Sequence, residues 1–252
     1  MAEKLSSVRN AARILKQFSA RNREYGVSEL SRKLELSKST THRLLSTLAA
    51  EGLLSQDPTT GKYRLGLAMY DLGSAVGSRL DLHEAVIPPM EILRNRTGET
   101  VHVAVLDRRE VVYVERLDSP HGLRLFLEVG RRNAAHSTAT GKCLLAHLPS
   151  VELDAVLDGW KLEKKTEHTV TSIRKLREQL FEVRRRGYAE NRSESELGVL
   201  SIAGPIRGPL GRVVASISVA GPTERMEKDL HKVIQAVSEA AAQSSRQLGY
   251  RG

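Results

Sequence analysis

The sequence lacks the residues and segments on which several classes of protein depend. Cys143 is the only cysteine among 252 residues, which excludes an intrachain disulfide and a zinc site with four cysteine ligands. No apolar run approaches the ~20 residues that cross a bilayer, and the polar start MAEKLSSVRN lacks the apolar core of a signal peptide. We therefore expect a soluble, cytoplasmic protein in a reducing compartment.

Motifs for catalysis and metal binding are also missing. Cys143 and His147 are four residues apart on a predicted helix, where they could meet as nucleophile and base or share a metal. No HExxH, CxxC or dense histidine cluster supplies further ligands. We therefore expect no catalytic residues and no metal site. A small-molecule-processing enzyme with a basic domain is the alternative, and turnover of a bound acid would favour it.

Positive charge is abundant and unevenly distributed. The chain carries a formal net charge of +9. Residues 1–80 hold 13 Lys and Arg against 7 Asp and Glu, whereas residues 81–252 hold 26 against 23. A cluster of cations favours a polyanionic partner, because neutralised phosphates release their counterions. The length predicts two domains. Because the excess positive charge lies in the N-terminal one, we expect that domain to bind a nucleic acid.

Three helices are predicted near the N-terminus. The first is amphipathic, and its apolar face is Val8, Ala11, Ala12, Leu15 and Phe18. A second helix begins at Ser28 and ends near Glu35–Leu36, and Ser37 then caps a third helix, KSTTHRLLSTLAAEG. That helix buries Leu44, Leu45 and Leu48.

Polar residues crowd the first turns of this third helix, as major-groove reading requires of the second helix of a helix-turn-helix. Arg43 is the candidate for a bidentate contact to guanine, while Lys38, Ser39 and Thr41 would touch the DNA backbone or cap the helix. The predicted contacts on this helix are Ser37, Lys38, Ser39, Thr40, Thr41, His42 and Arg43. The alternative is a small helical domain in which these hydroxyls only cap a helix.

A predicted hairpin follows, with its turn at residues 57–61 and a charged second strand. This is the usual wing of a winged helix, and Lys62 and Arg64 could hold a phosphate or the minor groove. Helical spacing then continues through Met69 and Leu72 toward Leu80. We expect a linker helix that pairs with its copy in a dimer or packs on its own chain.

The remaining sequence mixes predicted hairpins with helices, which favours an antiparallel sheet with helices packed against it, an α+β fold. The predicted strands are VHVAVLD, VVYVERL, LRLFLEV, VLSIAGPI and RVVASISVA, and the predicted helices are Thr140–His147, Ser172–Arg186 and Glu224–Gln247. The basic run RKLREQLFEVRRRG is either a solvated helix face or a second nucleic-acid site.

Two segments of this region are candidates for binding a small molecule. The small-residue stretch 136–142 opens a helix, whose free N–H groups and positive end favour an anion; an ordinary capped helix start, with Gly141 needed for packing, is the alternative. Ser216 and Ser218 share one face of a predicted strand. Their hydroxyl groups would face either a ligand or solvent.

The order of these parts resembles the IclR family of bacterial transcriptional regulators over essentially the whole chain. The matching segments are ELSRKLELSKSTTHRLLSTLAAEGLL followed by YRLG, then AHSTATGKCLLA, and GYAENRSESELGVLSIAGPI. The resemblance implies a winged helix-turn-helix at residues 1–66, a linker helix at 67–81, and an effector-binding domain with a GAF- or PAS-like sheet at 82–252. It further implies a DNA operator, a homodimer or tetramer, and a small organic acid as effector with no other cofactor.

The resemblance also implies an effector site. Its expected residues are Leu123 and Leu125 as an apolar lid, with His136, Ala139, Thr140, Asn191, Ser201, Ser216 and Ser218. Asn191 departs from the Asp or Ser common there, so a formal negative charge is missing. We expect an allosteric repressor or activator of a catabolic operon; an effector-independent architectural DNA-binding protein is the alternative.

Overall fold

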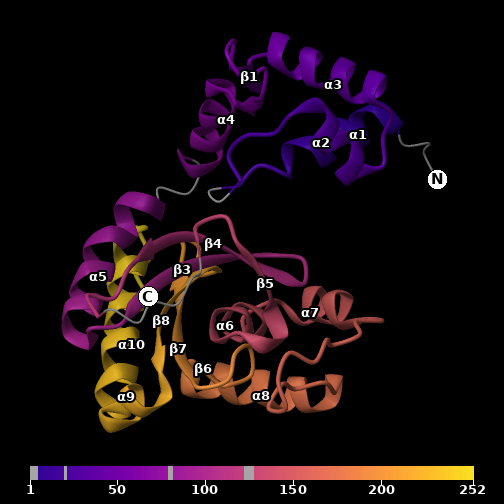
Figure 1. The fold of residues 1–252 in the computed structure, drawn as a ribbon. Helices are drawn as coiled ribbons and strands as arrows, with labels where there is room; N and C mark the ends of the chain where they lie inside the picture. The colour runs from indigo at the N-terminus through magenta and orange to yellow at the C-terminus, as the bar shows by residue number, and fades with distance from the viewer. Residues whose placement is uncertain (1–4, 20–21, 79–81, 122–127) are drawn as a thin grey trace. The chain divides into compact units, whose positions relative to one another are not determined.

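The computed structural model describes residues 5–19, 22–78, 82–121 and 128–252, and the chain divides into two units, Met1–Leu80 and Asp81–Gly252 (Figure 1). The α+β class predicted from the sequence is confirmed. None of the described helices is long and apolar enough to cross a membrane.

The first unit is a winged helix-turn-helix. It consists of α1 (Ser6–Leu15), α2 (Val27–Leu34), α3 (Lys38–Ala50), and a hairpin of β1 (Leu54–Gln56) and β2 (Tyr63–Leu65). α2 ends at Glu35, whose positive φ of 56° closes the turn into α3. Apolar side chains from all three helices and the hairpin form the core, including Ile14, Leu30, Leu45 and Tyr63. α1 ends before the predicted Phe18, which still packs edge-on against Tyr25.

A further helix, α4 (Leu67–Ser78), follows the hairpin. Its start is fixed by Gly66, where an added Cβ would lie 2.1 Å from the carbonyl oxygen of Gly52. Three of its large apolar side chains are solvent-exposed: Leu67 (84%), Tyr70 (75%) and Leu72 (57%).

The second unit is built on a six-stranded antiparallel sheet with strand order β5-β4-β3-β8-β7-β6. The strands are β3 (Thr100–Asp107), β4 (Glu110–Leu117), β5 (Arg132–Ala134), β6 (Ala189–Arg192), β7 (Val199–Arg207) and β8 (Val213–Pro222). The two predicted hairpin strands before residue 118 are therefore β3 and β4, and the last two predicted strands are β7 and β8.

Helices cover both faces of this sheet (Figure 1). α5 (Leu82–Thr97) and α10 (Leu230–Gln247) pack on one face, and α6 (Ala139–Ala146) packs on the other, with α8 (Ile173–Arg186) behind α6. Gly204 of β7 faces α10, where an added Cβ would lie 2.9 Å from the Cβ of Ala241. Because side chains alternate along a strand, Ser216 and Ser218 of β8 lie on the α6 face.

Several elements differ from the sequence-based expectation. α5 was not predicted, and it contains Pro88 and Pro89; its buried face, which includes Val86, Met90 and Leu93, keeps it helical despite the lost backbone donors. The predicted helix Glu224–Gln247 is two helices, α9 (Thr223–Lys228) and α10, which meet at Asp229. The predicted strand LRLFLEV lies outside the described residues except for its last two.

Further short elements complete the unit. A 3-10 turn, η1 (Ala135–Ser137), leads into α6, and α7 (Ser150–Leu157) follows it. An alanine at Gly141 of α6 would place its Cβ 2.2 Å from the carbonyl oxygen of Ala135. The glycine therefore lets α6 pack directly against η1.

Candidate DNA-binding surface and effector pocket

The first turns of α3 present a polar and basic surface. Ser37 caps the helix, since its Oγ accepts a hydrogen bond from the Thr40 N–H at 3.1 Å. The exposed residues of these turns are Lys38, Ser39, Thr40, His42 and Arg43. Within the described residues neither the Lys38 ammonium nor the Arg43 guanidinium forms an ion pair, so both are available to a phosphate or a base edge.

Thr41 does not belong to this surface. Its side chain is fully buried, and its hydroxyl donates to the Ser37 carbonyl oxygen at 3.0 Å. The structure therefore removes Thr41 from the predicted contacts and assigns it to the packing of α3. Sequence analysis overlooked Ser46, which lies one turn beyond Arg43 on the same exposed face.

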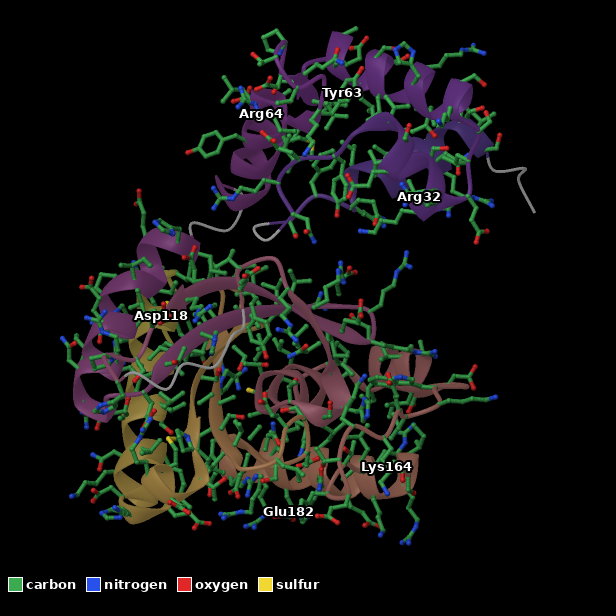
Figure 2. All side chains as sticks on the ribbon, viewed as in Figure 1. Arg32, Tyr63, Arg64, Asp118, Lys164 and Glu182 are labelled. Carbon is green, nitrogen blue, oxygen red and sulfur yellow. The ribbon has the colours of Figure 1, made fainter. Side chains whose placement is uncertain are left out.

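The β1–β2 hairpin is a rigid wing. Asp57 Oδ1 accepts hydrogen bonds from the Thr59 and Thr60 N–H groups, both at 2.8 Å. These backbone bonds hold the pKa of the Asp57 carboxyl below its usual value. On β2, the buried Tyr63 alternates with the exposed Arg64, so the tyrosine anchors the strand and the arginine points outward (Figure 2).

The charged residues of the wing stay at its surface. Lys62 is exposed, and Arg64 Nε donates to Ser55 Oγ at 3.1 Å. Among the described residues Arg64 makes no other hydrogen bond, so most of its donors are available to a phosphate.

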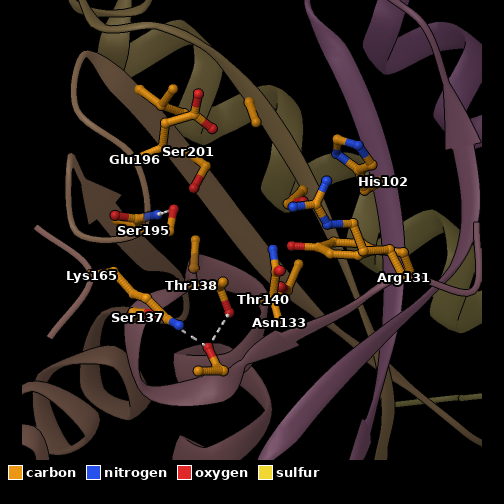
Figure 3. A pocket seen from close by; sticks show the side chains of 17 residues that line it. His102, Arg131, Asn133, Ser137, Thr138, Thr140, Lys165, Ser195, Glu196 and Ser201 are labelled. Atoms are coloured by element: carbon orange, nitrogen blue, oxygen red, sulfur yellow. Dashed lines mark hydrogen bonds between the residues drawn. The ribbon is translucent and has the colours of Figure 1, made fainter. Parts of the chain in front are cut away.

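The second unit encloses a pocket of about 220 Å³ between the sheet and the start of α6 (Figure 3). Its lining is His102, Tyr113, Arg131, Asn133, Ala134, Ser137, Thr138, Ala139, Thr140, Lys165, Asn191, Ser195, Glu196, Val199, Ser201, Ser218 and Ala220. His102 and Arg131 lie on one side of the pocket, and Ser195, Glu196 and Ser201 lie on the other.

The start of α6 lines the pocket with backbone N–H groups. The Thr138 side chain caps the helix by accepting from the Gly141 N–H at 3.1 Å. The Ala139 and Thr140 N–H groups have no partner among the described residues. Free N–H groups at a helix start carry the positive end of the helix dipole, and such a site favours an anion.

Two cations add to this potential at the pocket rim. Arg131 reaches into the pocket (Figure 3). Lys165 also lines it and pairs with Glu163 at 2.7 Å, with its side chain 39% exposed. Glu196 on the opposite side brings one negative charge. The lining thus carries two cations, Arg131 and Lys165, and one anion, Glu196.

The pocket contains five of the predicted effector residues: Ala139, Thr140, Asn191, Ser201 and Ser218. The strand register brings them together. Asn191 of β6 pairs with Ser201 of β7, Ser201 pairs with Ala220 of β8, and Ser218 lies on the same face of β8. Asn191, Ser201 and Ser218 therefore come from distant parts of the chain but share one face of the sheet, and Ala139 and Thr140 line the pocket from the start of α6.

The Asn191 side chain also holds part of the pocket wall in place. Its Nδ2 donates to Ser195 Oγ at 2.8 Å, and its Oδ1 accepts from the Glu194 N–H at 2.8 Å. The side chain therefore holds the loop that forms one wall of the pocket.

Four predicted effector residues are not in the pocket as described. His136 is buried beside Trp160, and its Nε2 lies 2.9 Å from the Glu163 carbonyl oxygen. Ser216 is buried and donates to the Gly204 carbonyl oxygen at 3.0 Å. Both lie outside the pocket lining: the Ser216 hydroxyl and His136 Nε2 contact backbone carbonyl oxygens, and His136 Nδ1 is buried without a hydrogen bond to any described residue. Leu123 and Leu125 lie outside the described residues.

Sequence analysis missed His102, Tyr113, Arg131, Asn133 and Lys165. His102 pairs with Ser218 in the β3–β8 register, and a shift of β3 and β4 places Tyr113 opposite Ala104. Alternation predicts which residues of one strand share a face, but it does not say which strand lies alongside. No signal in the sequence therefore identified these residues.

A buried ion pair supports the pocket from behind. Lys142 of α6 pairs with Glu194, and its Nζ also donates to the Glu190 carbonyl oxygen at 3.1 Å. The two side chains are 3% and 9% exposed. Burial lowers the pKa of Lys142 while Glu194 opposes that shift. The pair ties α6 to the loop after β6.

Comparison with known proteins agrees with this architecture. Residues 7–58 match the IclR helix-turn-helix domain, and residues 74–246 match the C-terminal domain of the bacterial transcriptional regulator IclR. The chain belongs to the IclR family of bacterial transcriptional regulators. It is a DNA-binding regulator and not an enzyme.

Individual IclR relatives match over almost their whole length. The chain is 36% identical over 249 residues to the HTH-type transcriptional regulator KdgR of Escherichia coli, covering 98% of this chain and 94% of that protein. It is 35% identical to the HTH-type transcriptional regulator XynR of E. coli, covering 98% of each. An IclR homologue from Microbacterium hydrocarbonoxydans, solved with 4-hydroxybenzoate, superposes with a TM-score of 0.86 at 28% identity, covering 96% of this chain and 99% of that one.

Cys143 has a packing role in this IclR regulator. It lies on α6 and is fully buried in the core, and burial raises the pKa of its thiol to about 12. His147 Nδ1 lies 2.8 Å from the Cys143 carbonyl oxygen, so the histidine contacts the backbone. Across the described part of the chain, no three His, Cys, Asp or Glu side chains gather as a metal site would require.

Proposed function

We propose that this IclR regulator is a homo-oligomer that represses or activates a catabolic operon, and that a small organic acid in the pocket controls its affinity for DNA. The observation that carries the proposal is the start of α6, where free Ala139 and Thr140 N–H groups lie near Arg131 and Lys165. Such donors bind small anions, and a carboxylate is one of them.

The proposed DNA contacts are the exposed residues of α3 and the wing. The set is Ser37, Lys38, Ser39, Thr40, His42, Arg43, Lys62 and Arg64. Arg43 is proposed to read a guanine, and the lysines to hold phosphates.

We further propose that residues 67–81, of which 79–81 lie outside the described residues, link the domains at 1–66 and 82–252 as a helix. The exposed Leu67, Tyr70 and Leu72 support pairing with a second copy, because exposed apolar groups favour burial against a partner. Effector binding would then alter how two winged helices fit paired half-sites. The coupling is reciprocal, so operator DNA should change the effector affinity by the same factor.

The proposal is tested by equilibrium binding to DNA from upstream of the protein's own gene and to a scrambled duplex, at physiological salt. A preference of about 10³ or more is expected. Arg43→Ala should lose about 1–3 kcal/mol at the best operator and relax specificity at one base pair. An equal loss on all DNA would make Arg43 a phosphate contact, and near-equal binding of both duplexes would favour the architectural alternative.

A matched control is Arg174→Ala on α8. Arg174 is 79% exposed and pairs with Glu178, and Arg185 on the same helix pairs with Glu182, so both of these charges are already paired at the surface. The variant makes the same charge change and should leave operator affinity unchanged. A comparable loss would instead support a second nucleic-acid site on α8.

A further inference from the structure

One end of the pocket carries neutral polar groups that the proposed carboxylate site does not use. His102 of β3 and Tyr113 of β4 lie with their ring centroids 5.1 Å apart, and both are almost fully buried. Asn133 and Thr140 lie beside the Tyr113 hydroxyl. Because burial keeps both rings uncharged, this cluster offers hydrogen bonds without a formal charge.

Two atoms of this cluster are left without partners. His102 Nε2 and Thr140 Oγ1 are buried, and neither makes a hydrogen bond to any residue that the structure describes. A buried polar atom without a partner costs free energy comparable to a lost hydrogen bond. Both residues line the pocket, so a ligand with hydroxyl groups would supply the missing partners.

The rest of the lining agrees with a hydroxylated ligand. Small-molecule pockets are usually apolar, with a few polar groups for orientation. Among the described residues that line it, the apolar members are Ala134, Ala139, Val199 and Ala220, none of them large. A ligand with an alkyl chain or an unsubstituted ring would exclude water from the polar side chains without forming hydrogen bonds to them.

We propose that the effector is a polyhydroxylated carboxylic acid, with its carboxylate at the start of α6 and its hydroxyl groups on the cluster of His102, Tyr113, Asn133 and Thr140. This inference rests on the proposed function and names the class of acid. Ser201 and Ser218 on the sheet receive the remaining hydroxyl groups.

Calorimetric titration of the full-length protein with matched acids tests the ligand class. The probes are D-gluconate, D-galactonate and D-mannonate, compared with hexanoate, which has the same chain length without hydroxyl groups, and with 4-hydroxybenzoate. At least one of the three sugar acids should bind tenfold or more tightly than hexanoate and 4-hydroxybenzoate.

The two proposals fail in different ways in this experiment. If hexanoate or 4-hydroxybenzoate binds as tightly as every sugar acid, the inference is overturned while acid control of the regulator survives. If no acid binds at all, both the inference and the proposed effector class are overturned.

Protein variants test the cluster itself. Tyr113→Phe removes one hydroxyl at nearly constant volume and should weaken the best sugar acid about tenfold, with hexanoate affinity unchanged. His102→Leu provides a second variant with the same expected loss of selectivity. The matched control is Tyr188→Phe, the same chemical change at a tyrosine outside the pocket. Equal losses for sugar acid and hexanoate would show that the cluster only supports the fold.

Discussion

Replacing His102 by glutamine should reduce the loss of stability of the effector domain in acid. Burial, with a smaller contribution from the positive charge of Arg116, lowers the pKa of His102 from 6.5 to about 3. The folded state therefore keeps the ring neutral at a pH where the unfolded chain binds a proton. Stability then rises with pH between about 3 and 6.5 and is fully present above 6.5.

The size of the effect follows from the shift. Each pKa unit corresponds to about 1.4 kcal/mol, so lowering the pH to 5.0, about 1.5 units below the unfolded pKa, should cost about 2 kcal/mol through this residue. His136 and His147 also have lowered pKa values because they are partly buried. Both remain in the variant, so their contributions cancel when the two proteins are compared.

Equilibrium urea denaturation at pH 7.5 and pH 5.0 measures this difference. Trp160 is the only tryptophan and packs on His136, so its fluorescence reports on the effector domain alone. The wild type should lose about 2 kcal/mol more than His102→Gln between the two pH values. Equal losses would refute the reasoning, because they would mean that folded His102 titrates near its ordinary pKa.

Three further predictions concern the core around α6. Lys142→Met should destabilise the effector domain by about 3–5 kcal/mol, because it leaves Glu194 as a buried charge without its partner. Adding Glu194→Gln should recover part of the loss. A single variant as stable as the wild type in urea denaturation would contradict this. Gly141→Ala should cost about 1–3 kcal/mol or more, since its Cβ would overlap the Ala135 carbonyl, and an unchanged thermal midpoint would show that η1 can move aside. Cys143, buried and with its pKa raised to about 12, should react with a thiol reagent at pH 8 only in urea, so rapid labelling of native protein would show an accessible thiol.

Local chemistry made much of the fold predictable. Ser37 caps α3 as expected, because the Ser37 hydroxyl oxygen accepts from the N–H of Thr40, three residues further along the same helix start. The β3–β4 hairpin was also located, since residues 108–110 join two adjacent strands. α5 was missed because Pro88 and Pro89 oppose a helix locally, and only packing against the sheet and α10 compensates for them.

The sequence by itself determined the DNA-reading helix, the wing, the family and the start of α6, because each depends on residues close together in the chain. Only the tertiary structure decided which of these residues are accessible: it buried Thr41 and Ser216 and moved His136 out of the pocket. It also placed His102 beside Ser218 and Tyr113 beside Asn133. The register between strands more than 100 residues apart is set by the packing of both sheet faces, which no local pattern contains.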